Sequence, residues 1–97
     1  MKETDKQASL FTAIADFQRR KILNLLKQGE MSVATIKEHF DVSGATLSHH
    51  LSVLKNAELV RVKRQGQQRI YTLNLSVLEE LALLMNQLLK RGHDEDK

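Results

Sequence analysis

The stretch that decides the fold is SGATLSHHLSVLKNA, residues 43–57. A helix over these residues places leucines on one side and small polar side chains on the other. A helix face meant only for solvent is usually rich in Glu and Lys, which are good helix formers. Short, uncharged side chains instead allow close approach to a surface rich in hydrogen-bonding groups, as in the DNA major groove. The leucine side comprises Leu47, Leu51 and Leu54, and the outward side comprises Ala45, Ser48, His49, Ser52 and Asn56.

Length and composition predict one small domain. The 97 residues, 41% of them hydrophobic, suffice for a modest core that pairing with a second copy would stabilise. We expect a single domain over 1–97, with flexible tails at 1–7 and 92–97. The absence of cysteine excludes disulfides, thiolate metal sites and thiol catalysis.

The chain offers no segment that predicts membrane insertion. Its longest apolar run, residues 81–85, is far shorter than the roughly 20 residues that a membrane span needs. The polar start MKETDKQ has no secretory signal. We therefore expect a cytoplasmic protein that is not itself membrane-inserted.

Positive charge is concentrated in residues 43–69. This segment holds five basic residues and one acid, a net charge of +4, while the whole chain carries +3. A basic segment of this kind indicates a polyanionic partner. On charge alone, a solvated basic surface remains an equal alternative. The basic residues are Lys55, Arg61, Lys63, Arg64 and Arg69, and the acid is Glu58.

Apolar periodicity predicts helices before residue 43 as well. One covers Ala8 to Ile14, and a second runs from about residue 17 to residue 28, capped by Asp16 and ended by Gly29. A short third helix opens at Ser32, with apolar residues at Val33, Ile36 and Phe40.

The connection between the third and fourth helices is only a few residues long. Ser43 is a good N-cap for the fourth helix, and Val42 is suited to be a buried plug between the two. Two short helices joined in this way form a helix-turn-helix.

The period changes from helical to alternating at Leu59. Apolar and charged residues alternate to Lys63, a polar tip follows at 64–68, and apolar residues return from Ile70 to Leu73. This pattern predicts a two-stranded hairpin, with Gly66 at its turn. A hairpin directly after a reading helix is interpreted as a wing that contacts DNA. The alternative is a hairpin that only covers the core.

The last helix carries more apolar residues than one small domain needs. Ser76 and Glu79 have the spacing of a capping box. Apolar residues then cover well over half of the circumference, which implies burial against a second surface, and two-fold homodimers are the commonest soluble oligomers. The alternative is a helix that buries everything against the first two helices of its own chain. The predicted dimer residues are Leu10, Phe11, Leu78, Leu81, Met85, Leu88 and Leu89.

The order of these elements, with the motifs along them, resembles the ArsR/SmtB family of small winged-helix transcriptional repressors. The resemblance rests on DFQRRKILNLL at 16–26, MSVATIKEHF at 31–40, SGATLSHHLSVLKNAELV at 43–60 and RQGQQRIYTLN at 64–74. It implies a mainly α fold with a two-stranded β-hairpin: four helices, the hairpin, then a fifth helix, as a homodimeric winged helix-turn-helix.

The chain departs from the family pattern at three places. Phe17 and Gln18 stand where the family usually has Pro-Thr, and Glu58 stands where it usually has Gly, a residue that accepts positive φ cheaply. The third departure is the missing cysteine pair with which many members bind metal ions. The stretch that matches it, SVATIKEHF, contains no thiol.

Other members bind zinc between their last helices through Asp, His and Glu. Here that helix has no histidine, and only Glu79 and Glu80 could be ligands. The run His93, Asp94 and Glu95 lies in a charged tail that is too mobile to hold tetrahedral geometry. We therefore expect no metal site and no cofactor.

The histidines of the reading helix do not form a metal clamp either. His49 and His50 are adjacent and point about 100° apart, unlike an i, i+4 pair. His49 faces outward toward DNA, whereas His50 lies at the edge of the leucine face and is expected to pack or bond locally. His39 is expected to be exposed at a helix end.

These features predict a sequence-specific DNA-binding repressor that binds a palindromic operator as a homodimer. The chain offers no Gly-rich phosphate loop and no spaced catalytic set, so we do not expect an enzyme. Two alternatives stay open: a winged-helix protein–protein adaptor, and a repressor that responds to a metal or small molecule at a non-standard site. The predicted DNA contacts are Ser43, Gly44, Ala45, Thr46, Ser48, His49, Ser52 and Lys55 in the reading helix, and Lys63, Arg64, Gln65, Gln67, Gln68 and Arg69 in the wing.

The resemblance also bears on regulation. Some cysteine-free members of the family repress their own genes and are captured by a membrane protein made alongside them. Autoregulation and a sequestering membrane partner are therefore hypotheses for this chain. The sequence leaves the operator and the inducing signal open.

Overall fold

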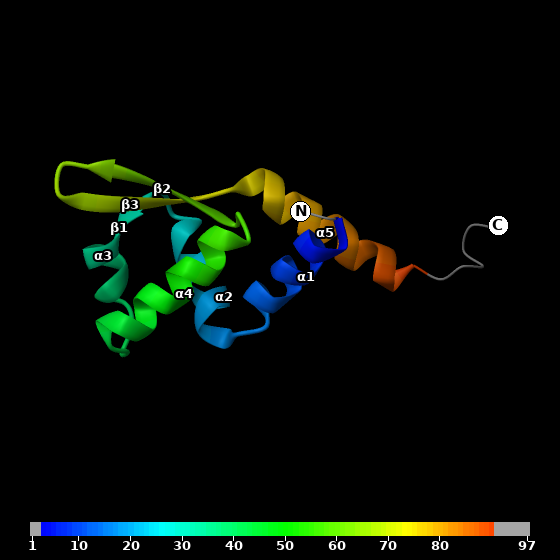
Figure 1. Cartoon of the computed structure of the whole chain (residues 1–97), viewed down its shortest axis with the longest axis horizontal. Helices are drawn as coiled ribbons and strands as arrows, with labels where there is room; N and C mark the ends of the chain where they lie inside the picture. The colour runs from blue at the N-terminus through cyan, green and yellow to red at the C-terminus, as the bar shows by residue number, and fades with distance from the viewer. Residues whose placement is uncertain (1–2, 91–97) are drawn as a thin grey trace.

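The computed structural model describes residues 3–90 (Figure 1). Five helices and a small sheet follow one another in the order expected of a winged helix-turn-helix, which confirms the predicted fold class. The elements are α1 (Glu3–Ile14), α2 (Phe17–Leu26), β1 (Met31–Ser32), α3 (Val33–Lys37), α4 (Gly44–Asn56), β2 (Val60–Gln65), β3 (Gln68–Leu73) and α5 (Leu75–Leu89).

The sheet has one strand more than the predicted hairpin. Its three antiparallel strands lie in the order β1-β3-β2, and Met31 pairs with Tyr71 of β3. A strand of two residues is too short to show alternation in the sequence. It ties the start of α3 to the wing, because Ser32 is both the end of β1 and the N-cap of α3.

The leucine side of α4 is buried in the core, as predicted. Leu47, Leu51 and Leu54 are each at most 2% exposed. Burying a leucine contributes about 2 kcal/mol, so these three side chains hold α4 firmly against the rest of the domain. The core around them comprises Leu10, Ala13, Ile22, Leu23, Leu25, Leu26, Ile36, Phe40, Ala57, Leu59, Val60, Tyr71, Val77 and Leu81.

The predicted helix starts at residues 16, 32 and 43 are confirmed. The Asp16 carboxylate accepts from the backbone N–H of Gln18 at 2.7 Å. The hydroxyls of Ser32 and Ser43 accept from the N–H groups of Thr35 and Thr46, each at 3.1 Å. These bonds satisfy donors that the first turn of a helix leaves unpaired.

The starts of α1 and α5 differ from the expectation, and α2 ends at Leu26 rather than near residue 28. Residues 3–7, expected to be a flexible tail, belong to α1, while the expected tail at 92–97 lies outside the described residues. α5 begins at Leu75, one residue before the predicted capping box, so that prediction is wrong. The residue before it, Asn74, makes no side-chain cap and instead donates from its amide to the carbonyl of Glu58 at 2.9 Å.

The turn from α4 into the wing is made at Glu58, which adopts a positive φ of 64°. The N–H of Glu58 donates to the carbonyl of Lys55 and that of Leu59 to the carbonyl of Leu54, the pair of bonds of a Schellman motif. Glycine is the usual residue at this position because a Cβ is strained there. The sequence-based expectation of a strained turn is therefore confirmed.

The hairpin turn, by contrast, has its glycine in place. Gly66 and Gln67 form a two-residue loop between β2 and β3, and Gly66 has a φ of 64°. Within residues 3–90 no helix is long and apolar enough to cross a membrane.

Replacing Glu58 by Gly should stabilise the protein. Relief of the left-handed backbone should outweigh the added entropy of the unfolded chain and raise the free energy of unfolding by about 1 kcal/mol. Chemical denaturation at one fixed protein concentration measures it. Glu58→Ala, which removes the carboxylate but keeps the Cβ, is the control. An equal gain in both variants would show that charge, and not backbone strain, is relieved.

Candidate nucleic-acid interface

The outward face of α4 is open to solvent along its whole length. Every predicted contact residue on it, from Ser43 to Lys55, is exposed. The helix has no acidic residue in its first turn, so its N-terminal N–H groups face solvent without a competing carboxylate. Thr46 is partly engaged already, because its hydroxyl lies 3.0 Å from that of Ser43. The remaining predicted contacts on this face are Gly44, Ala45, Ser48, His49 and Ser52.

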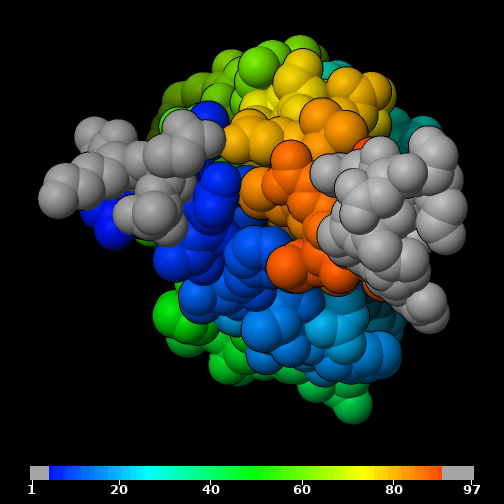
Figure 2. All heavy atoms as spheres, turned by 90° about the vertical axis from the view of Figure 1, so that its right-hand side faces the viewer, coloured from blue at the N-terminus to red at the C-terminus, as the bar shows by residue number. Residues whose placement is uncertain are grey.

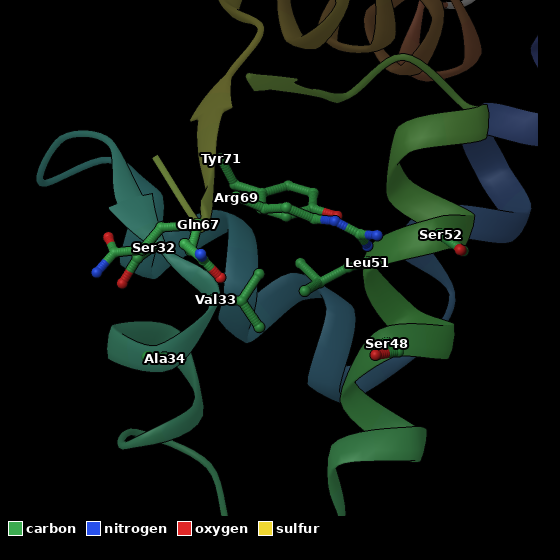
Figure 3. A pocket seen from close by; sticks show the side chains of 10 residues that line it. Ser32, Val33, Ala34, Ser48, Leu51, Ser52, Gln67, Arg69 and Tyr71 are labelled. Carbon is green, nitrogen blue, oxygen red and sulfur yellow. The ribbon is translucent and has the colours of Figure 1, made fainter. Parts of the chain in front are cut away.

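A hollow of about 340 Å³ lies between this face, the start of α3 and the wing (Figure 3). Figure 3 shows Arg69 reaching from β3 toward α4 beside the ring of Tyr71, with Leu51 and Val33 projecting into the space below. Hydroxyl, amide and guanidinium groups therefore surround a partly apolar floor. The lining residues are Ser32, Val33, Ala34, Ser48, Leu51, Ser52, Gln67, Gln68, Arg69 and Tyr71.

The register of the wing directs two of its three arginines, Arg64 and Arg69, toward α4. Arg64 pairs with Arg69 and Val62 pairs with the buried Tyr71, and alternate residues of a strand share a face. Both arginines thus lie on the helix side of the hairpin. They line a second hollow, of about 350 Å³, together with Lys55, Val62, Lys63 and Tyr71. Positive charge from the helix end and from the wing meets at this place.

The other predicted wing residues differ in their surroundings. The Lys63 ammonium lies 3.3 Å from the carboxylate of Glu30. Both side chains are more than half exposed, so the ion pair is weak and does not hold Lys63 away from a phosphate. Gln65 and Gln68 pair at the end of the hairpin and are exposed, as is Gln67 in the turn.

His50 packs on the buried side of α4, as expected, but its polar contacts are not the expected local ones. It is 8% exposed, and its partners are on α2 rather than nearby in the sequence. The Nδ1 atom lies 3.2 Å from Nη1 of Arg19, and Nε2 lies 4.0 Å from Oδ1 of Asp16. The expectation of local bonding is therefore wrong. The role of Arg19 had no signal in the sequence, because the contact joins residues 31 positions apart.

The carboxyl group of Asp16 holds its proton less tightly than usual. Burial alone would raise its pKa, but the backbone N–H groups of Arg19 and Gln18, with the charge of Arg19 and that of His50 whenever it is protonated, outweigh burial and lower the pKa below 3.8. The carboxylate thus stays ionised as the cap of α2.

The other two histidines of the described residues are exposed, as expected. They are His49 and His39, and Nδ1 of His39 lies 3.0 Å from the carbonyl of Thr35.

The predicted dimer residues fall into three groups. Leu10 and Leu81 are 0% and 6% exposed inside the protomer, so naming them as contacts with a partner was wrong. Leu10 packs in the core because α1 lies against α2 and α4. Phe11 and Leu78 are half-buried at its edge. The predicted residues that lie open on α5 are Met85, Leu88 and Leu89, at 41%, 72% and 78% exposed.

This apolar surface lies at the opposite end of the molecule from the wing tip (Figure 1). Figure 2 shows α1 and α5 side by side at that end. An ion pair of 3.6 Å between Lys6 and Glu80 joins the two helices. Because so many leucines of α5 stay exposed, the helix does not bury its apolar surface within one chain, as the alternative interpretation required.

Within residues 3–90, no three or more His, Cys, Asp or Glu side chains are grouped so that they could hold a metal ion. Glu80, one of the two carboxylates of the last helix, is paired with Lys6, and Glu79 is exposed. The run His93, Asp94 and Glu95 lies outside the described residues.

A reading helix that exposes small polar side chains, followed by a basic hairpin, defines a winged helix-turn-helix, the architecture of many DNA-binding proteins. The family model described as "Bacterial regulatory protein, arsR family" matches residues 16–62. The transcriptional repressor SdpR of Bacillus subtilis is 42% identical over 87 residues, covering 90% of this chain and 97% of the relative. This chain belongs to the arsR family of bacterial regulatory proteins, which are transcriptional regulators and not enzymes.

Two further similarities agree with this assignment. The arsenical resistance operon repressor of Staphylococcus aureus is 34% identical over 79 residues, covering 81% of this chain and 76% of the relative. A solution structure from Mycobacterium bovis, described as a homodimeric winged helix-turn-helix DNA-binding domain, superposes with a TM-score of 0.74. It is 32% identical, and the similarity covers 97% of this chain and 86% of that one.

Asp16 should make the stability of the protein depend on acid pH. Because its pKa is lowered on folding, its contribution is present above pH 3.8 and is lost as the pH falls below that value. Asp16→Asn keeps an N-cap acceptor but cannot titrate. We expect the advantage of the wild type over Asp16→Asn in free energy of unfolding to shrink as the pH falls below 3.8.

Asp16→Ala serves as the control for the cap itself. It should cost about 1 kcal/mol at neutral pH. A wild type and an Asp16→Asn variant that lose stability in parallel on acidification would contradict the assignment of the low pKa to Asp16.

Proposed function

We propose that this protein is a homodimeric transcriptional repressor that binds a palindromic DNA site. The observation that carries the proposal is the exposed, uncharged polar face of α4 beside Arg64 and Arg69 of the wing. In a two-fold dimer, two such helices enter successive major grooves about one helical turn apart. The repressor names of two relatives and the DNA-binding domain from Mycobacterium bovis support the same function.

The roles of the residues follow from their chemistry. Ser48, His49 and Ser52 can hydrogen-bond to base edges, with Thr46 as a weaker contributor because its hydroxyl is shared with the cap. Ala45 is suited to contact a thymine methyl group. Backbone phosphates are assigned to the N-terminus of α4 with Ser43 and Gly44, and to the charged and amide side chains around it. This last set comprises Lys55, Lys63, Arg64, Gln65, Gln67, Gln68 and Arg69.

Dimerisation is assigned to a line of apolar residues along α5. Leu75, Leu78, Ala82, Met85 and Leu89 are spaced by three and four residues, which is the a and d repeat of a coiled coil. Leu75 and Leu89 are 64% and 78% exposed, and Met85 is 41% exposed. We call these five residues the α5 seam. A second copy of the chain, with its own seam and the neighbouring surface of α1, is the partner that fits.

An adaptor function is less well supported. A protein-binding winged helix would expose an apolar patch on the outward side of α4. That side instead carries hydroxyl and imidazole groups, and the hollow beside it holds a guanidinium group.

We further propose that the protein acts in the cytoplasm, where its DNA would lie. Regulation of its own gene and capture by a membrane protein are hypotheses from the family resemblance. Mapping the bound sites across the source genome tests the first of these. The absence of a site upstream of its own gene would exclude autoregulation.

The division between base reading and phosphate binding can be tested with DNA titrations. A duplex selected by the wild type from a random library and a scrambled duplex are titrated at several salt concentrations. Ser48→Ala and His49→Ala should each cost about 1–3 kcal/mol on the selected duplex and little on the scrambled one. Arg64→Ala should weaken both duplexes and flatten the salt dependence. Equal losses on both duplexes for Ser48→Ala and His49→Ala would contradict base reading.

The α5 seam can be tested by placing charge on it. Met85→Glu and Leu89→Glu should each shift the protein toward the monomer in sedimentation velocity, because two like charges would be buried at the dimer contact. Leu83→Glu is the matched control, since Leu83 is 64% exposed but lies roughly 120° around the helix from the seam. A Leu83→Glu variant that dissociates as readily as the seam variants would disprove this interface.

A further inference from the structure

Arg19 joins three helices around one guanidinium group. Its Nε donates to the carbonyl of Ala13 at 2.7 Å, and its Nη2 donates to the carbonyl of Thr12 at 3.0 Å. Both carbonyls are at the C-terminal end of α1, where the last carbonyls of a helix lack intrahelical partners, although that of Thr12 also accepts from the N–H of Ala15 at 3.2 Å. The remaining nitrogen, Nη1, lies 3.2 Å from Nδ1 of His50 on α4. Arg19 itself is in the first turn of α2.

The chemistry of this contact determines the proton position on His50. A guanidinium group only donates hydrogen bonds, so Nδ1 of His50 must be the acceptor. The imidazole is then neutral, with its proton on Nε2. Nε2 lies 4.0 Å from Oδ1 of Asp16, and an N–H group is favourable beside this carboxylate.

His50 lies on the inner side of the helix whose outer side reads DNA. It is 8% exposed, so it cannot contact DNA itself. Through Arg19 it is connected to the end of α1, and α1 lies beside α5 on the surface assigned to the dimer. A shift of α4 relative to α1 would change the spacing between the two reading helices of a dimer.

We propose that Arg19 and His50 are positioning residues that set α4 relative to α1, and that His50 does so as a neutral hydrogen-bond acceptor. This inference rests on the proposed function as a DNA-binding dimer. It assigns a role in DNA affinity to two side chains that touch no DNA. It also makes the affinity depend on the protonation of His50.

The charged groups around His50 determine the direction of that dependence. Arg19 and Asp16 face it from α2, α1 offers the carbonyls that Arg19 binds, and His49 lies beside it on α4 with ring centroids 5.8 Å apart. Protonation puts an N–H on Nδ1, directly against a donor of Arg19, so the contact is lost. Although Asp16 attracts the imidazolium, it does so from the Nε2 side and cannot restore the contact.

Protonation of His49 acts in the opposite direction. Its exposed side chain is on the outward face, so a positive charge there would favour a polyanion. Acidification that weakens DNA binding therefore points to His50 rather than to His49.

Two substitutions distinguish the hydrogen-bond acceptor of His50 from the volume of its side chain. His50→Asn keeps an acceptor near the position of Nδ1 but does not titrate, whereas His50→Leu fills the space without an acceptor. On a duplex selected by the wild type at pH 7.5, His50→Leu should bind about tenfold more weakly, the effect of one lost buried hydrogen bond. His50→Asn should bind within about threefold of the wild type. Circular dichroism and sedimentation identify any variant that has lost its fold or its dimer.

The pH dependence of DNA affinity is the second measurement, because the volume of the His50 side chain alone would not produce it. Between pH 7.5 and pH 5.5, the wild type should lose affinity severalfold, and His50→Asn should lose none. His49→Asn is the matched control: it removes only the opposing contribution of His49, so it should lose at least as much affinity on acidification as the wild type. Parallel profiles for the wild type and His50→Asn, or equally weak binding by folded His50→Asn and His50→Leu dimers, would overturn the proposal.

The protonation state can be measured without DNA. Long-range ¹⁵N–¹H spectra of the imidazole at pH 7.5 should show Nδ1 of His50 without a proton and Nε2 with one. The reverse tautomer would overturn the proposal. If the wild type selects no duplex at all, the DNA-binding function fails, while the spectrum still reports on the Arg19–His50 contact.

Discussion

Burial of the leucine side of α4 is the constraint on which the rest of the structure depends. Leu47, Leu51 and Leu54 are almost completely removed from water. At about 2 kcal/mol each, they supply a stabilisation comparable to the total stability of a small domain, roughly 5–15 kcal/mol. The helix therefore cannot rotate about its axis without exposing them. The same burial that stabilises the fold keeps the hydroxyl and imidazole groups of the opposite side facing outward.

The wing depends on the end of this helix. α4 ends in a Schellman motif, and the chain turns at Glu58 with a positive φ. The amide of Asn74 holds the carbonyl of Glu58 from the other end of the hairpin. Because both ends of the hairpin are fixed in this way, the register places Arg64 and Arg69 on the side of α4. A strained residue and one buried amide thus determine where the positive charge of the wing lies.

The elements that could be predicted are those with a local physical cause. The caps at Asp16, Ser32 and Ser43, the two faces of α4 and the hairpin turn at Gly66 depend on neighbours in the chain, so periodicity and turn chemistry reveal them. The third strand was missed because two residues carry no alternation. The capping box at Ser76 was wrong because α5 begins at Leu75, with Asn74 as its N-cap residue two positions before Ser76 and the Asn74 side chain bonded elsewhere.

Residue types and their spacing are sufficient to predict a small, cysteine-free winged helix-turn-helix with a polar reading face and a basic wing. These properties follow from residue type and spacing along single elements. The packing of the helices in three dimensions places Leu10 and Leu81 in the core and leaves the end of α5 open. It alone decided that His50 bonds to Arg19. Such contacts depend on how helices far apart in the chain pack against one another, and no local pattern encodes that packing.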